Sequence, residues 1–185
     1  HAPRDQAFAL HHLAATLHLQ GAYHEEQALL HESIALSEAE GDHWLTGYSR
    51  NDLGLCTHRL GDDHAARRFC TDSFVIFKAL DDRRGIAFAL NNLGVIAAAQ
   101  GEYSKAERLH RESLVLRHDI DDRWGIAMSL LQLGAVLRAD GQFDDSRARL
   151  LDALRAAYEI RALPVALDIL VELAHLLILA GDHAQ

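Results

Sequence analysis

The sequence has few of the residues that mark secreted, disulfide-rich or disordered proteins. It contains two cysteines and two prolines in 185 residues. Two cysteines are too few for a disulfide framework, so the sequence favours a reducing compartment, and we expect a cytoplasmic location. With so little proline and no low-complexity stretch, nothing indicates a disordered linker. The sequence shows no secretory signal and no apolar run of membrane-spanning length.

Positive charge is also scarce. The chain has 18 lysine and arginine residues against 27 aspartate and glutamate residues, which gives a formal net charge of −9. Binding to phosphate groups needs clustered basic side chains, so this balance argues against direct contact with nucleic acid or an anionic membrane. Hydrophobic residues make up 49% of the sequence, enough to bury a core. The chain opens at His1 without a methionine, and we expect it to be part of a longer protein.

The sequence does contain a segment that is repeated several times. DRRGIAFALNNLG begins at Asp82, and DRWGIAMSLLQLG begins at Asp122, 40 residues later. A second set of glycines recurs in the same register along the whole chain: Gly21, Gly61, Gly101, Gly141 and Gly181. A fixed period of this kind indicates a repeat architecture. The predicted repeats cover residues 2–41, 42–81, 82–121 and 122–161, and a half repeat covers 162–185.

Each repeat is predicted to form two antiparallel helices. In the third repeat, apolar residues spaced for one helix face run from about Asp82 to Gln100. An aspartate stands where an N-cap belongs, and the recurring glycine suits a left-handed turn after the helix. The second helices begin near an aromatic residue at Tyr23, Tyr103 and Phe143. Because no helix pair can bury its apolar face alone, the pairs are expected to stack into one all-α solenoid domain spanning 1–185.

These residues resemble the tetratricopeptide repeat (TPR). The family pattern of Leu-Gly, a small residue, Gly, an aromatic residue, Ala and a late small residue reads here as Leu93-Gly94, Ala97, Gly101, Tyr103, Ala106 and Ser113. The 40-residue form is similar to the C-terminal repeats of bacterial LuxR-type regulators and related signal-transduction ATPases, and to the repeats of eukaryotic spindle-orientation adaptors. The resemblance implies about four and a half antiparallel helix pairs in a right-handed superhelix, with the first helices lining a concave groove.

The sequence contains no motif for catalysis or cofactor binding. A phosphate-binding loop, GxGxxG after a strand, GxSxG and HExxH are all missing. Cys56 and Cys70 fall on apolar helix positions, where a buried structural role is expected. His18 and His58 share a register, but solvated histidine is a simpler interpretation than a metal site. We therefore expect no enzyme activity, no cofactor and no bound metal.

The first helices place polar side chains in the groove register that the resemblance implies. The expected partner-binding residues are His11, Asn51, Asp52, His58, Arg59, Asn91, Asn92, Gln132 and Arg138. Amide and imidazole groups can donate to and accept from the backbone of an extended peptide. An amide-rich centre with an apolar end at Leu131 and Val171 suits an amphipathic helix or strand. The alternative is a solvated groove that holds nothing.

The last predicted helix, roughly Pro164 to Ala180, has an apolar tail. Terminal repeats need a polar outer face, and the tail offers none at Leu176, Leu177, Ile178 and Leu179. Either a following helix that covers this surface is missing from the chain, or the surface binds a partner or forms a homodimer. The two interpretations are compatible.

The function expected from these features is that of a non-enzymatic module for protein or peptide interaction. The resemblance implies a regulatory or sensor part of a larger bacterial transcriptional or signalling regulator. The partner is either a separate protein or other domains of the same protein. Sensing of a small molecule or short peptide in the groove is one alternative, and an oligomerisation scaffold built on the last helix is another. The chain alone is expected to show neither ATPase activity nor duplex DNA binding.

Overall fold

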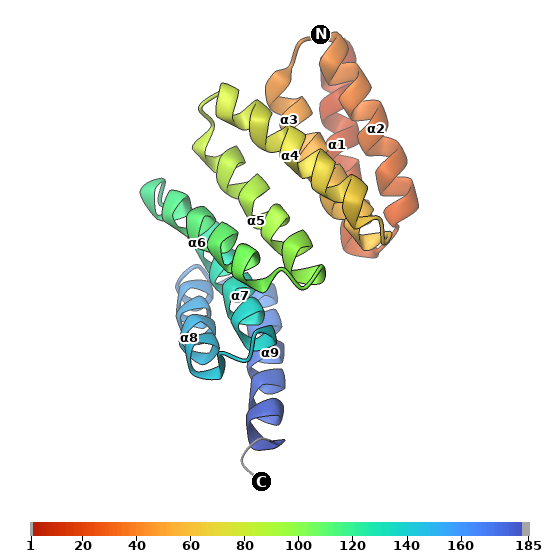
Figure 1. The fold of residues 1–185 in the computed structure, drawn as a ribbon. Helices are drawn as coiled ribbons and strands as arrows, with labels where there is room; N and C mark the ends of the chain where they lie inside the picture. Colours follow the sequence, from red (N-terminus) through yellow and green to blue (C-terminus); the bar gives the residue numbers. More distant parts are fainter. Residues whose placement is uncertain (1, 183–185) are drawn as a thin grey trace. The chain divides into compact units, whose positions relative to one another are not determined.

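The computed structural model describes residues 2–182, which form helices joined by short turns and contain no strand (Figure 1). The helices of this part of the chain are α1 (Ala2–Gln20), α2 (Tyr23–Ala39), α3 (His43–Arg59), α4 (Asp63–Ala79), α5 (Arg83–Ala99), α6 (Tyr103–Asp119), α7 (Arg123–Ala139), α8 (Phe143–Glu159) and α9 (Leu163–Asp182). The predicted all-α repeat fold is confirmed, including the second helices that begin at Tyr23, Tyr103 and Phe143.

The helix ends follow the predicted capping residues. The carboxylate of Asp42 accepts a hydrogen bond from the Leu45 amide at 3.1 Å, and Asp82 and Asp122 cap α5 and α7 in the same way. The turn glycines have positive φ angles, such as 91° at Gly61, which a residue with a side chain adopts at a cost. The fifth glycine of the series is different, because Gly181 lies inside α9 and not in a turn.

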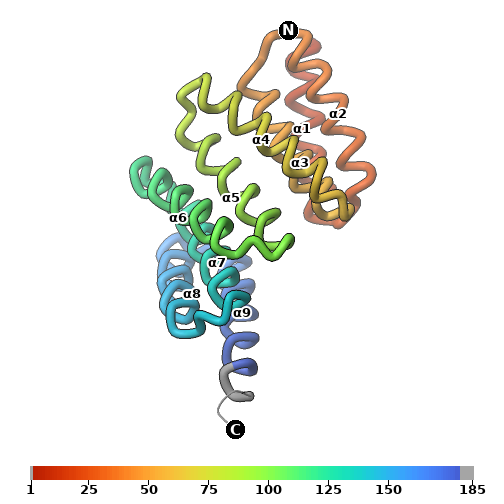
Figure 2. The backbone as a smooth tube through the Cα atoms, in the orientation of Figure 1, coloured from red at the N-terminus to blue at the C-terminus, as the bar shows by residue number. Residues whose placement is uncertain are grey.

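Two compact units divide the chain: His1–Ile96 is unit 1 and Ala97–Gln185 is unit 2. The sequence predicts a single domain spanning 1–185. In unit 1, α1 packs on α2 and α3, and α3 packs on α2 and α4. In unit 2, α7 packs on α6, α8 and α9. Figure 2 shows the same order as a backbone tube, with a short turn between consecutive helices.

The glycine of each Leu-Gly pair lets the two helices of a repeat approach closely. A Cβ atom on Gly134 of α7 would lie 2.6 Å from the Leu150 side chain of α8. Gly54 of α3 faces Cys70 of α4 in the same register. Cys70 and Cys56 are both fully buried, as predicted, and burial raises the pKa of each thiol to about 12.

We call the contact between the second helix of one repeat and the first helix of the next a joint. At two joints a large side chain packs against a glycine. Phe77, near the end of α4, is fully buried, and a Cβ atom on Gly85 of α5 would collide with its ring. In unit 2, the guanidinium of Arg117 on α6 takes the corresponding space beside Gly125 of α7. The glycine in each DRxGIA segment therefore makes room for the large side chain that precedes it by eight residues.

At the first and fourth joints the smaller residue belongs to the second helix and the larger residue to the first helix of the following repeat. Ser37 of α2 precedes Leu45 of α3, and both side chains are buried. Ala157 of α8 precedes Val165 of α9, and the two share one hydrophobic cluster. Each joint is thus filled by one large residue, which comes from the second helix in some repeats and from the first helix of the following repeat in others.

Candidate binding face on the first helices

The first helix of each repeat has one side that the helices packed on it leave accessible. On α3, Tyr48, Asp52 and Leu55 are half-buried and Arg59 is exposed, at the spacing of one helix face. Leu53, between them, is fully buried in the core of unit 1. We call this side the first-helix face of unit 1, and its accessible residues are Phe8, His12, Ala15, Leu19, Tyr48, Asp52, Leu55, Arg59, Phe88 and Val95.

An aromatic row crosses the first-helix face. Phe8, Tyr48 and Phe88 occupy the same position in three successive repeats. Phe8 is 48% exposed, and the Tyr48 ring lies 6.1 Å from the Phe88 ring and 4.5 Å from the Trp44 ring. The three residues are not among the predicted site residues, although an aromatic residue every 40 positions is visible in the sequence. Partly exposed aromatic rings offer large apolar contact area at low entropic cost, which suits the binding of a peptide.

The asparagines of the predicted amide-rich groove do not line this face. Asn51, Asn91 and Asn92 are only 0%, 7% and 2% exposed. Both polar atoms of the Asn51 side chain are buried without a hydrogen-bond partner in the described protein, as are Asn91 Oδ1 and Asn92 Nδ2. The first helices of successive repeats pack on each other in unit 1, as α1 does on α3, so this register lies beneath the surface. The prediction that these three amides are accessible to a ligand is wrong.

His11 lies between a hydroxyl and a carboxylate. Its Nδ1 is 3.2 Å from the Ser49 hydroxyl, and its Nε2 is 3.7 Å from Asp52 Oδ2. Burial, with a smaller contribution from the charge of His12, lowers the pKa of His11 to about 4. The order of these groups is that of a nucleophile, a base and an acid. Ser49, however, is fully buried and bonds to Ser33 at 3.0 Å, so no substrate reaches its oxygen and the network is structural.

A second polar cluster joins α1, α2 and α3. The carboxylate of Glu26 is almost completely buried and pairs with His18 Nδ1 at 3.0 Å. This hydrogen bond raises the pKa of His18. Burial, together with the negative charge of Glu26, raises the pKa of Asp52 to about 7. At neutral pH the first-helix face therefore carries one carboxyl group, Asp52, that is poised between its neutral and charged forms.

Replacement of Asp52 by asparagine is expected to stabilise unit 1 at alkaline pH. The pKa of Asp52 is higher in the folded chain than in the unfolded chain, so its contribution is fully present below pH 3.8 and is lost as pH rises through 7. Since Asp52 is partly accessible to solvent, the expected gain in unfolding free energy is about 1–2 kcal/mol at pH 8. The gain should shrink towards pH 5, as urea unfolding at both values can show. An equal gain at both values would contradict this assignment.

The other predicted residues lie in different surroundings. His58 Nδ1 is 2.6 Å from Asp63 Oδ1, at the turn between α3 and α4. Arg59 is exposed beside it. Gln132 and Arg138 belong to unit 2, where Arg138 Nε donates to Glu172 of α9 at 2.9 Å. The structure thus brings His11, Asp52, His58 and Arg59 onto α1 and α3 of one unit, and it ties Arg138 to α9.

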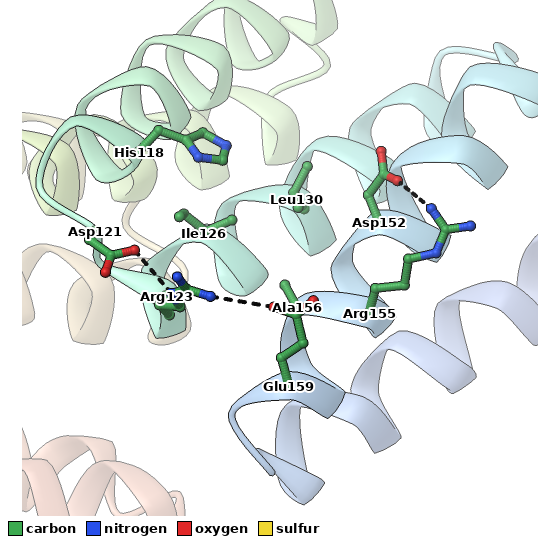
Figure 3. Close-up of a pocket in the computed structure, with 9 residues that line it drawn as sticks. All are labelled: His118, Asp121, Arg123, Ile126, Leu130, Asp152, Arg155, Ala156 and Glu159. Carbon is green, nitrogen blue, oxygen red and sulfur yellow. Dashed lines mark hydrogen bonds and ion pairs between the residues drawn. The ribbon is translucent and has the colours of Figure 1, made fainter.

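Unit 2 contains a cavity of about 340 Å³ between α6, α7 and α8 (Figure 3). Ile126 and Leu130 of α7 supply its apolar floor, and His118 extends towards it from α6. Ion pairs stand at its rim: Arg123 lies 3.0 Å from Asp121 and 3.5 Å from Glu159. Apolar lining with a few charged groups is typical of small-molecule sites, and this volume is near their lower limit.

Of the four residues predicted to form a surface on the last helix, three are exposed and one is buried. Leu177 and Ile178 are 65% and 63% exposed, and Leu179 is 37% exposed. Leu176 is only 3% exposed, because it packs in one cluster with Val165 and Ile169. Leu176 is therefore a core residue and not part of a contact surface.

Two further properties bear on function. Among the described residues, no three histidine, cysteine or carboxylate side chains gather where they could hold a metal ion. None of the helices described combines the length and apolar character that crossing a bilayer requires.

Comparison with known families identifies the repeat. A model of the family described as tetratricopeptide repeat matches residues 49–119, and a second model with the same description matches residues 9–40. The two matches cover more than half of the chain. The chain belongs to the tetratricopeptide-repeat family. TPR domains are scaffolds for protein interaction and are typically non-enzymatic, so a protein-interaction module is the functional class of this chain. No curated protein sequence matches it.

Solved TPR structures share the fold at low sequence identity. Aspartyl phosphate phosphatase F from Bacillus subtilis is 8% identical, with a TM-score of 0.82 over 98% of this chain and 48% of its own. A Rap protein complexed with competence and sporulation factor is 12% identical, with a TM-score of 0.81 over 96% and 55%. A signal transduction ATPase with a TPR sensor from Pyrococcus horikoshii is 14% identical, with a TM-score of 0.72 over 92% and 26%. The chain thus spans about half or less of these proteins.

Proposed function

We propose that the first-helix face of unit 1 binds an amphipathic peptide or helix of a protein partner. The observation that carries this proposal is the aromatic row, which stays partly exposed although a folded helix array normally covers such rings. Tyr48 and Phe88 offer apolar contacts, while Asp52, one turn from Tyr48, and Arg59, two turns further along α3, offer groups of both charges. A peptide with apolar residues at helical spacing and mixed charges between them matches this arrangement.

We further propose that the chain is the sensor part of a larger bacterial transcriptional or signalling regulator. The fold similarity to an ATPase described with a TPR sensor supports this role, and so does the similarity to a Rap protein solved with its competence and sporulation factor. The partner is either a separate protein or another domain of the same regulator. In this role the chain itself performs no catalysis and contacts no nucleic acid.

Affinity capture from bacterial lysate with a variant of the first-helix face tests the proposal. The variant combines Leu55→Arg, which places a charge in the apolar part of the face, with Arg59→Glu, which reverses the neighbouring charge. Recovery of the partner by the variant is expected to fall at least about tenfold, which corresponds to roughly 1.4 kcal/mol of binding free energy. Captured proteins are identified and quantified by mass spectrometry.

The matched control changes the charge by the same amount elsewhere on unit 1. Val75→Arg with Arg68→Glu alters two exposed positions of α4 and should leave capture unchanged. Both variants must first show the parent's circular dichroism spectrum and melting temperature. Equal capture by parent and both variants would remove the first-helix face from consideration.

A second candidate function is the sensing of a small molecule in unit 2. The cavity over Ile126 and Leu130 favours it, because Arg123 and Arg155 stand at its rim with Asp152 and could orient a charged ligand. A ligand that binds the folded chain alone raises its melting temperature. This function and peptide binding use different units, so the two can be examined independently.

A further inference from the structure

α9 exposes an apolar stripe that its counterpart α7 buries. Leu170 is 49% exposed, whereas Leu130, in the same register 40 residues earlier, is 6% exposed. Leu177 is 65% exposed, whereas Leu137 is 1% exposed. On α7 these positions are covered by neighbouring helices, including α8, but within residues 2–182 no helix covers them on α9. The stripe continues through Leu167, Val171, Ala174 and Ile178, all of them exposed.

The apolar residues of the stripe are spaced almost symmetrically about Ala174. Leu170 lies four residues before Ala174 and Ile178 four residues after it, while Val171 and Leu177 lie three residues before and after. In an antiparallel pair of identical helices whose two-fold axis passes Ala174, Leu170 of one copy faces Ile178 of the other, and Val171 faces Leu177. Such spacing by three and four residues is the seam along which helices pack, and a small central residue lets their axes approach.

Charge does not oppose this pairing. No charged residue lies on the stripe, and Glu172, on the other side of α9, is paired with Arg138 of the same copy at 2.9 Å. The first helix of the chain is a poorer match for α9, since the exposed residues in the corresponding face of α1 include Gln6, Thr16 and Gln20. A second α9 therefore matches the apolar stripe better than α1 does.

We propose that two copies of this chain form a symmetric dimer through an antiparallel pair of α9 helices centred on Ala174. The contact buries the apolar stripe of both copies at once and is self-complementary, as a two-fold interface requires. It is separate from the first-helix face, which lies in unit 1. Dimerisation would present two first-helix faces in one assembly, so a partner with two binding segments would be held more tightly than a partner with one.

Sedimentation of the purified chain over a range of concentrations tests the proposal. The mass is expected to rise to twice 20.5 kDa and to go no further. Leu177→Glu places a charge in the seam and should halve the mass at the same concentration, without harm to the fold because Leu177 is 65% exposed. The control Val115→Glu changes a residue of α6 that is 61% exposed and should leave the dimer intact.

Disulfide trapping tests the register. Ala174→Cys should form a covalent dimer readily under mild oxidation, because the two symmetry-related positions meet at the axis. Leu163→Cys, at the far end of α9, is the control and should not crosslink at a comparable rate. The native thiols of Cys56 and Cys70 are buried and add no background. A chain that stays monomeric overturns the proposal, as does a mass that climbs beyond the dimer or equal crosslinking of the two cysteine variants.

Discussion

Replacement of Phe77 by alanine is expected to lower the free energy of unfolding by about 3–5 kcal/mol, the range for large aromatic residues in well-packed cores. Phe77 is fully buried, and its ring packs against Tyr48 at a centroid distance of 4.7 Å. Gly47 and Gly85 both lie against the same ring, so no side chain at these positions can move in to fill the space. Urea unfolding followed by circular dichroism measures the loss.

A double-mutant cycle tests whether the contact between Phe77 and Gly85 contributes to stability separately from the loss of core volume. Gly85→Ala alone is expected to cost about 1–3 kcal/mol, because the new methyl group collides with the Phe77 ring. In the Phe77→Ala background the same change should cost much less, since the ring is gone. Equal costs in both backgrounds would show that Gly85 and Phe77 are energetically independent, contrary to the packing.

Replacement of His110 by leucine is expected to stabilise the chain, and more so in acid. His110 lies on α6 at a fully buried position where the equivalent residues are Leu30, Cys70 and Leu150, and neither of its ring nitrogens has a hydrogen-bond partner among the described residues. Removing these orphaned polar atoms should contribute about 1–2 kcal/mol at pH 8. Burial, with a smaller contribution from Arg117, lowers the pKa of His110 to about 3.

The pH dependence of this gain follows from that pKa. The unfolded chain takes up a proton at His110 near pH 6.5 and the folded chain only near pH 3, so His110 costs stability as pH falls between these values. By pH 5 the leucine variant should therefore gain about a further 2 kcal/mol over the parent. Val115→Leu, an exposed change on the same helix that alters no titratable group, serves as the control and should show no such increase. A gain for His110→Leu that is independent of pH would contradict the buried neutral imidazole.

The regular features of the fold could be predicted from the sequence because they depend on local chemistry. Asp82 caps α5 and Gly61 takes a positive φ angle whatever lies further away, so a fixed 40-residue register is enough to locate both. Burial of Cys56 and Cys70 was also predictable, since Ile96 and Val136 share the register of Cys56, and Leu30 and Leu150 share that of Cys70. These inferences need no knowledge of how one repeat packs on the next.

The binding face could not be predicted in the same way. Asn51 and Asn91 are polar and occupy a groove register in the family pattern, yet neighbouring helices cover them here. Leu176 was assigned to the surface with Leu177, although one step along a helix turns a side chain by about 100° and puts Leu176 in the core. A polar residue at one position was therefore a weaker indicator of the accessible face than the aromatic residues at 8, 48 and 88, which recur every 40 residues.

The alternation of large and small residues at the joints has a consequence for how this array can evolve. Phe77 fits before Gly85, and Ala157 fits before Val165, but the two halves of these joints are not interchangeable. A recombination event that placed Phe77 before Leu45 would force two large side chains into space for one, while Ala157 before Gly85 would leave a void. Side-chain volume thus restricts the order of the repeats, because a second helix that ends in a large residue must be followed by a first helix that begins with a glycine.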